Sequence, residues 1–221
     1  MTNFIPIFPL NVVVFPSEEL NLHIFEPRYK QLIRECFSDV KPFGIPTVIN
    51  NKIGDWGTLV KVQEIVKTYE NGEMDIRTKG VTVFRILEII KSIPSKLFSG
   101  AIVNYPENDP SGNEELMKKV LAGLKEMHRL LKVSKHYKKP ESALTSYDIA
   151  HHCGLSLEEE YEMLGLLQET QRQEYLKRHI NKIIPVLNET ENLKKKIKMN
   201  GHFRNLSSFD FDDIGKGQQD S

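Results

Sequence analysis

The spacing of apolar residues changes once along this chain, and that change constrains the fold more than any other feature. Residues 20–24 alternate between apolar and polar side chains, which is the two-residue period of a half-buried strand. Residues 116–131 instead repeat apolar side chains at helical spacing. Between them, residues 106–112 are crowded with Pro, Gly, Asn and Asp, which marks a boundary. We therefore expect an α+β protein with a β domain over residues 1–105 and a small helical bundle over residues 111–200.

The β domain is predicted to be a meander of short strands that curls into a barrel. Residues 58–68 are rich in β-branched side chains, and residues 81–90 and 97–105 have the composition of further strands. Asn71 and Gly72 tolerate positive φ angles, so the chain is expected to reverse there through a type I′ hairpin turn.

One helix is predicted to interrupt the strands. It would begin near Pro27, because the first turn of a helix makes no use of the N–H that proline lacks. Its apolar residues are spaced so that they share one face: Tyr29, Leu32, Ile33, Cys36 and Phe37. Cys36 is therefore interpreted as a buried apolar residue rather than a reactive thiol. The only other cysteine is Cys153, so the chain has no disulfide framework.

The second half of the chain is predicted to be helical. Asn113 can cap the first helix, residues 144–153 form a shorter one, and Ser156 opens the next with a glutamate three residues later as a capping box. The last helix is expected from about Gln171, and Pro185 should kink or divide it.

Residues 201–221 contain three phenylalanines among Asn, Ser, Asp and Gly without a sustained period. This composition predicts a flexible acidic and aromatic tail that is disordered or loosely docked. Two interpretations stay open for Phe203, Phe209 and Phe211: they belong to an inert tail, or they form a short linear motif for a partner.

Familiar catalytic motifs are missing from the sequence. It has no Gly-x-x-x-x-Gly-Lys-Ser/Thr phosphate loop, no Gly-x-Ser-x-Gly nucleophile elbow and no His-Glu-x-x-His zinc motif. The run His151-His152-Cys153 makes a poor metal site, because helical neighbours point about 100° apart. Glu18 and Glu19 would face opposite sides of a strand. The sequence therefore predicts no catalytic residue, no metal ion and no cofactor.

Charge is balanced over the chain, with 30 Lys and Arg against 30 Asp and Glu. This balance argues against a protein that coats nucleic acid or an anionic membrane with its whole surface. Residues 118–139 nevertheless hold eight basic residues and one acid, whereas residues 158–174 hold six acids and one base. A candidate docking stripe in the first segment consists of Lys118, Lys125, Arg129 and Lys132. Two interpretations stay open: a solvated face of the bundle, or a docking surface for an acidic partner or nucleic acid.

The N-terminal residues lack a basic start and are interrupted by Pro6, Pro9 and Pro16, so we expect no signal peptide. Nowhere do 18 apolar residues run together, so we expect no membrane span and no membrane partner. The expected location is cytoplasmic.

Two runs near the N-terminus resemble a known family. Residues 5–16 read Ile-Pro-Ile-Phe-Pro-Leu-Asn-Val-Val-Val-Phe-Pro, and residues 22–32 read Leu-His-Ile-Phe-Glu-Pro-Arg-Tyr-Lys-Gln-Leu. They are similar to the start of the Lon protease N-terminal (substrate-recognition) domain, with its Pro-Leu strand, Phe-Pro turn and Leu-His-x-Phe-Glu-x-Arg-Tyr helix entry. The motif residues are Pro9, Leu10, Phe15, Pro16, His23, Phe25, Glu26, Arg28, Tyr29, Gly57 and Gly80. The run Thr82-Val83-Phe84 departs from the Arg-Phe that the family commonly has.

The resemblance covers about residues 4–190 and implies a PUA-like β-pseudobarrel followed by a small helical bundle. In complete Lon proteases this unit helps to recognise unfolded or tagged proteins, while a separate ATPase and a Ser-Lys peptidase do the chemistry. The chain is too short for either, so the resemblance implies a stand-alone, non-catalytic protein that binds polypeptide segments in protein quality control. Its partners would be polypeptide substrates or a protease or chaperone. The motif residues are expected to hold the fold, and Glu26 is expected to pair with Arg28.

Two other functions stay open. PUA-like barrels elsewhere bind RNA, so the alternative is an RNA-binding module that uses residues 118–139. A cryptic hydrolase is the third hypothesis.

Overall fold

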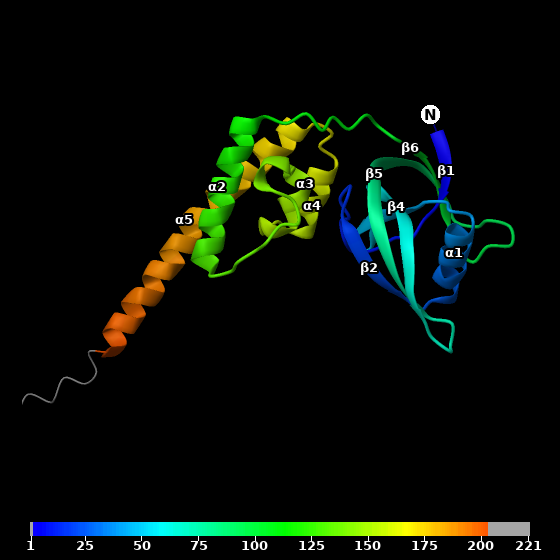
Figure 1. Cartoon of the computed structure of the whole chain (residues 1–221), viewed down its shortest axis with the longest axis horizontal. Coiled ribbons are helices and arrows are strands. Elements are labelled where there is room, and N and C mark those ends of the chain that lie inside the picture. Colours follow the sequence, from blue (N-terminus) through cyan, green and yellow to red (C-terminus); the bar gives the residue numbers. More distant parts are fainter. Residues whose placement is uncertain (1, 203–221) are drawn as a thin grey trace, which may run out of the picture.

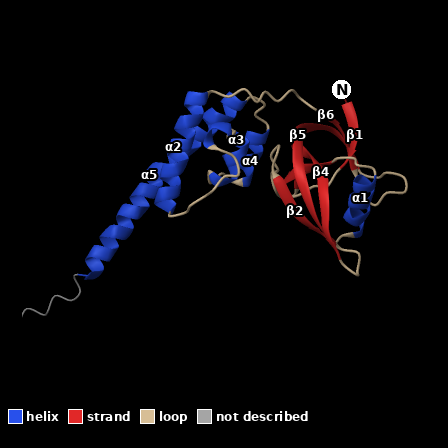
Figure 2. Cartoon of the chain, viewed as in Figure 1, coloured by secondary structure: helices blue, strands red, loops and turns tan. Residues whose placement is uncertain are grey.

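The structure is a computed structural model that describes the backbone of residues 2–202. The first half of the chain holds all the strands of the described residues together with helix α1, and the other helices follow in the second half (Figure 1; Figure 2). The strands are β1 Thr2–Pro6, β2 Glu19–Ile24, β3 Phe43–Ile49, β4 Lys52–Thr68, β5 Met74–Ile90 and β6 Gly100–Asn104. The α-helices are α1 Pro27–Ser38, α2 Glu114–Leu131, α3 Ser146–Ile149, α4 Leu157–Leu164 and α5 Glu169–His202. The predicted α+β class is confirmed. The predicted tail lies outside the described residues from position 203 onward.

All six strands form one antiparallel sheet in the order β1-β6-β5-β4-β3, and β2 pairs with the first part of β5. The sheet closes on itself because residues 7–10, directly after β1, run parallel to β3. The Phe8 N–H donates to the Gly44 carbonyl at 2.8 Å, and the Val48 N–H donates to the Leu10 carbonyl at 2.7 Å. The expected barrel therefore forms. Hydrogen bonds between residues 7–10 and β3 close it, and we call this junction the seam of the barrel.

The hairpin between β4 and β5 lies where the sequence places it, but its turn type was predicted wrongly. Of the two turn residues only Gly72 has a positive φ, at 77°, whereas a type I′ turn needs two such residues. The Tyr69 N–H donates to the Glu73 carbonyl at 2.9 Å, so three residues form the loop. A three-residue loop with one glycine in the left-handed region is another common hairpin connection.

Helix α1 packs on the barrel through Tyr29, Leu32, Ile33 and Cys36, all of which are buried as predicted. Phe37 is an exception, since 44% of it is exposed. At 100° per residue it lies at the edge of the apolar arc, next to the end of the helix at Ser38, and so turns away from the core.

The helical half packs around the pair α2 and α5. Gly123 of α2 lies so close to α5 that an added Cβ would meet the Ile180 Cγ2 at 2.9 Å. The single helix expected over residues 144–153 is instead two short pieces, α3 and the 3-10 turn Ala150–His152, and a further 3-10 turn precedes them at Glu141–Ala143. A capping box of Thr145 and Asp148 starts α3 at Ser146, two residues later than expected. Helix α5 continues through Pro185 without being divided.

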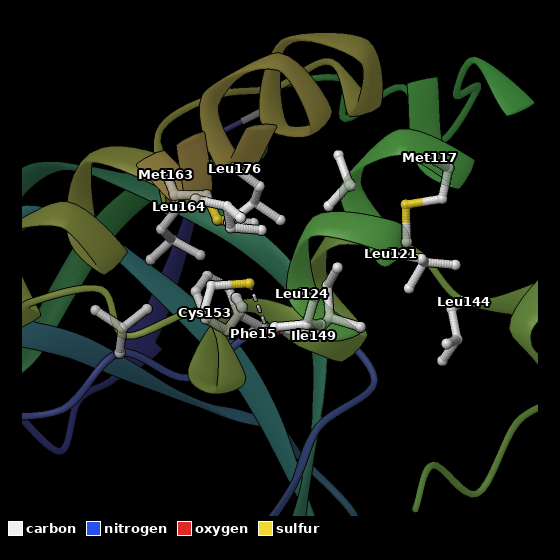
Figure 3. Packing of buried hydrophobic residues seen from close by; sticks show 14 of the residues in the cluster. Phe15, Met117, Leu121, Leu124, Leu144, Ile149, Cys153, Met163, Leu164 and Leu176 are labelled. Atoms are coloured by element: carbon white, nitrogen blue, oxygen red, sulfur yellow. Dashed lines mark hydrogen bonds between the residues drawn. The ribbon is translucent and has the colours of Figure 1, made fainter. Parts of the chain in front are cut away.

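Barrel and helices share one hydrophobic core (Figure 3). Phe15 belongs to the barrel yet is fully buried among helical side chains, together with Val13 and Val83. The helical residues of this cluster include Met117, Leu121, Leu124, Leu144, Ile149, Cys153, Met163, Leu164 and Leu176. The helical bundle is therefore packed directly against the barrel.

Arg172 fixes the segment that connects the two parts. This arginine is 1% exposed, and its guanidinium lies 4.2 Å from the ring centre of Tyr147. It donates to the Asn108 side chain at 2.9 Å and pairs with buried Glu169 at 2.9 Å. Ser146 donates its hydroxyl to the same carboxylate at 2.6 Å. A buried arginine needs such a set of partners to offset the loss of hydration.

Candidate functional site

A groove lies where the seam of the barrel opens. Residues 7–10 are hydrogen-bonded to β3. Among the described strands, β1 pairs with β6 alone. The other edge of β1 faces the segment 39–42, which leads into β3. The space between them has a volume of about 580 Å³. We call it the seam groove; its lining residues include Phe4, Ile5, Pro6, Cys36, Pro42, Ile93, Phe98 and Tyr105.

Backbone groups of β1 line one side of the seam groove. The Ile7 N–H donates toward β6, to the Ser99 carbonyl at 3.0 Å, while the next N–H, that of Phe8, points toward β3. Because backbone groups alternate along a strand, the N–H and carbonyl of Phe4 point toward the groove. Pro6 has no N–H to offer at the point where the seam closes. Within residues 2–202, no strand pairs with this edge of β1.

Apolar side chains dominate the seam groove, and its charges are paired with one another. Phe4 is 53% exposed, and its ring covers Gly100 so closely that a Cβ there would lie 2.3 Å from the ring. On the rim, Lys96 pairs with Glu35 at 2.7 Å, and Lys41 pairs with Asp39 in the same way. The groove is therefore suited to an apolar ligand with a backbone of its own that can form hydrogen bonds.

Cys36 lies at the base of the seam groove and is 5% exposed. Burial raises the pKa of its thiol to about 12. Such a thiol stays protonated near neutral pH, so it offers neither a nucleophile nor a metal ligand. Among the residues whose side chains the structure describes, no group of three or more His, Cys, Asp or Glu is placed to hold a metal ion.

The residues of the Lon-like motif do not line the seam groove. Several of them instead make contacts that hold the barrel closed. Leu10 accepts the seam hydrogen bond from Val48. A Cβ on Gly80 would lie 2.2 Å from the Phe15 carbonyl, and one on Gly57 would lie 2.6 Å from the Ile45 carbonyl.

Four further motif residues, Phe25, Glu26, Arg28 and Tyr29, lie at the start of α1. The Arg28 guanidinium pairs with Glu26 at 2.7 Å, as predicted, and lies 4.6 Å from the ring centre of Tyr29. The Tyr29 ring stacks on Phe8 with centroids 3.8 Å apart. The side chain of Phe25 is 58% exposed. None of the motif residues lines the seam groove, so the sequence prediction missed this candidate site.

His23 belongs to a polar cluster at the hairpin end of the barrel. Its Nδ1 lies 2.7 Å from an Asp75 carboxylate oxygen, and its Nε2 lies 3.3 Å from Glu73. The hydrogen bond to Asp75 raises the pKa of His23. Tyr69 donates its hydroxyl to the other Asp75 oxygen at 2.7 Å. This cluster ties β2 to the β4–β5 hairpin, and it lies outside the seam groove.

His151 joins the barrel to the helices. Its Nε2 lies 3.1 Å from Glu18, in the loop before β2, and its Nδ1 lies 2.7 Å from Glu160 of α4. Burial lowers the pKa of His151, but hydrogen bonds to Glu160 and Glu18 outweigh burial and raise the pKa to about 10. The ring also packs on Phe15, with centroids 4.9 Å apart.

The candidate docking stripe consists of exposed but mostly paired charges. Lys118 lies 3.0 Å from Glu114 and 2.9 Å from Glu115, one turn earlier in α2. Lys125 pairs with Glu141 at 2.7 Å, and Arg129 pairs with Glu126 at 2.8 Å. Lys132 follows the end of α2 with a left-handed φ of 57°, so it leaves the helical stripe. The helical geometry assumed for the fourth residue is thus wrong.

Comparison with known proteins identifies the family of the chain. The model of the ATP-dependent protease La (LON) substrate-binding domain matches residues 5–182. The chain belongs to the Lon substrate-binding domain family. The Lon N-terminal domain protein from Xanthomonas campestris has a similar structure, with a TM-score of 0.60 and 21% identity over 79% of this chain and 96% of that one. The N-terminal domain of Mycobacterium avium complex Lon protease aligns with a TM-score of 0.59 and 11% identity over 81% and 98% of the two chains.

These structures share the fold of this Lon substrate-binding domain, an antiparallel barrel followed by helices. Among the described residues, the helices of the domain are too short or too polar to cross a lipid bilayer.

Proposed function

We propose that this protein binds extended, apolar segments of polypeptide by adding them as a strand to β1 in the seam groove. The observation that carries this proposal is the open edge of β1 beside an apolar groove, in a chain of the Lon substrate-binding domain family. Backbone hydrogen bonds to an open strand edge supply affinity for any sequence, and neighbouring pockets select side chains. The Phe4 backbone would supply the hydrogen bonds, and Phe98 and Ile93 the apolar floor.

The protein would act as a non-catalytic recognition module in protein quality control in the cytoplasm. Its partners would be unfolded polypeptides and the protease or chaperone that receives them. Two observations support a role without catalysis. The sequence lacks the phosphate loop and nucleophile motifs, and the one thiol in the groove has a pKa raised to about 12.

Binding of a fluorescent apolar peptide, measured by anisotropy, tests the proposal. Phe4→Asp places a charge at the groove and should weaken binding by about tenfold or more. Phe25→Asp is the matched control, because Phe25 is exposed to a similar extent outside the groove, and it should leave affinity unchanged. A peptide with N-methyl groups along one edge should also bind poorly, since it cannot pair with β1. Equal loss in both variants would overturn the location of the site.

RNA binding through residues 118–139 is the second candidate, and it has less support. Three of the four stripe residues pair with acidic neighbours, so most of the positive charge of the stripe is compensated. RNA affinity that falls steeply with salt, and falls further when Lys118, Lys125 and Arg129 are changed to Glu, would favour this candidate over peptide binding.

A further inference from the structure

The C-terminal half of α5 extends past the helical bundle (Figure 1). It carries several exposed apolar side chains. Val186, Leu193 and Ile197 are 60%, 58% and 62% exposed. Helix α2, which packs along the first half of α5, ends at Leu131 and leaves this region uncovered. A protruding helix with several exposed apolar residues on one side is typical of an interaction surface.

These residues follow the spacing of a coiled coil. Val186, Thr190, Leu193 and Ile197 are separated by four, three and four positions, which corresponds to heptad positions d, a, d and a. At 100° per residue they lie within an arc of about 60°. We call this stripe the α5 seam. Around the helix axis, the α5 seam lies about 90° away from Leu187. Leu187 packs on the core that α5 shares with α2.

A shallow hollow continues the apolar surface beside the α5 seam. It has a volume of about 520 Å³ and lies between the end of α2 and α5. Leu130, Leu131, Leu187 and Ile197 supply its apolar lining, and Lys194 and Glu191 stand at its rim.

We propose that two copies of this chain associate through the α5 seam as a parallel coiled coil. Charge complementarity selects a second copy as the occupant. With Thr190 and Ile197 at position a, Glu189 takes position g and Lys194 takes position e of the next heptad. In a parallel pair, a g residue faces the e residue five positions further on in the other chain. Glu189 of each copy therefore faces Lys194 of the other, twice by symmetry.

The residue types agree with two parallel strands. β-branched side chains at position a with leucine at position d favour a two-stranded coil. Three of the four positions follow this rule, with Thr190 and Ile197 at a and Leu193 at d, and Val186 occupies the remaining d position. The family match ends at residue 182, so the α5 seam lies beyond the part of the chain that resembles Lon substrate-binding domains. The proposal is independent of peptide binding in the seam groove.

Light scattering coupled to size-exclusion chromatography tests association of the full chain. The wild type should shift toward the mass of two chains as its concentration rises. Leu193→Glu should raise the dissociation constant by about tenfold or more. Asn192→Glu is the matched control, because it adds the same charge at an exposed neighbour turned away from the α5 seam, and it should dimerise like the wild type. A wild type that stays monomeric, or equal behaviour of both variants, overturns the proposal.

Cysteine cross-linking tests the parallel register. In a parallel pair the two copies of Thr190 meet at the same a position, so Thr190→Cys should form a disulfide-linked dimer under mild oxidation. Asn192→Cys should not. The native Cys36 and Cys153 are buried, so they should contribute little cross-linking of their own. An antiparallel pair would separate the two Thr190 positions, so absence of the Thr190→Cys cross-link overturns the proposal.

Discussion

His151 and Glu18 form a hydrogen-bonded contact of 3.1 Å between the helical half and the barrel. The imidazole is held between this carboxylate and that of Glu160, and it lies against the ring of Phe15. Phe15 belongs to the core that both halves share. The contact therefore couples the protonation of one histidine to the packing of the two halves.

The stability of the protein should depend on pH through His151. Its folded-state pKa is raised to about 10 from the usual value of 6.5, so its contribution is fully present below about pH 6.5 and is lost as pH rises through about 10. His151→Gln should lower the free energy of unfolding at about pH 6 by about 2 kcal/mol, and by less at about pH 9. Urea unfolding at both values measures the difference. The exposed His136→Gln serves as control, and an equal loss at both values would contradict the account.

Removal of the Arg172 guanidinium should destabilise the protein strongly. Arg172→Met leaves the Glu169 carboxylate, which is 2% exposed, without its counter-charge, and a broken buried pair costs about 3–5 kcal/mol. Arg172→Lys should restore little of the lost stability, because an ammonium group cannot reproduce the planar set of hydrogen bonds that the guanidinium makes. The free energy of unfolding in urea provides the measurement. A loss below about 1 kcal/mol would mean that the network is not important for stability.

A methyl group on Gly80 should disturb the barrel. Its Cβ would lie 2.2 Å from the Phe15 carbonyl, a backbone atom that cannot turn aside, so Gly80→Ala should cost about 2–4 kcal/mol. Val81→Ala at the exposed neighbouring position is the control. Thermal unfolding monitored by circular dichroism measures both. An unchanged melting temperature for Gly80→Ala would show that this motif glycine is not required by packing.

Both cysteines should resist modification in the folded protein. Burial raises the pKa of Cys36 and of Cys153 to about 12, so the reactive thiolate is scarce at about pH 8. Reaction with a disulfide reagent should be slow in buffer and complete in concentrated urea. Rapid reaction of one thiol in buffer would indicate that it is accessible and would contradict the burial seen here.

Periodicity predicted the elements that depend on local spacing. The buried face of α1 follows from residues three and four positions apart, and the caps at Asn113 and Ser156 follow from side chains that accept backbone hydrogen bonds nearby. The strand pattern predicted a barrel, and the resemblance to the Lon family specified its type as a PUA-like pseudobarrel. Closure of the seam could not be predicted, because it pairs residues 7–10 with β3 across more than thirty positions.

The candidate site was harder to predict for the same reason. Phe4, Cys36 and Phe98 come from three separate segments, and nothing in their local sequence indicates a common groove. The charges of residues 118–139 show the same limit of local sequence. A count of basic residues cannot reveal that Lys125 reaches Glu141, since that pair depends on the path of the loop after α2.

Amide hydrogen exchange with and without an apolar peptide tests the central claim most directly. The Phe4 N–H points into the seam groove, whereas the Ile5 N–H alternates toward β6, so a bound strand should slow exchange at Phe4 and leave Ile5 unchanged. Slowed exchange at Phe4 on peptide binding is the predicted result. Peptide binding that leaves the Phe4 amide unprotected, or protects amides elsewhere on the barrel instead, would contradict strand addition to β1.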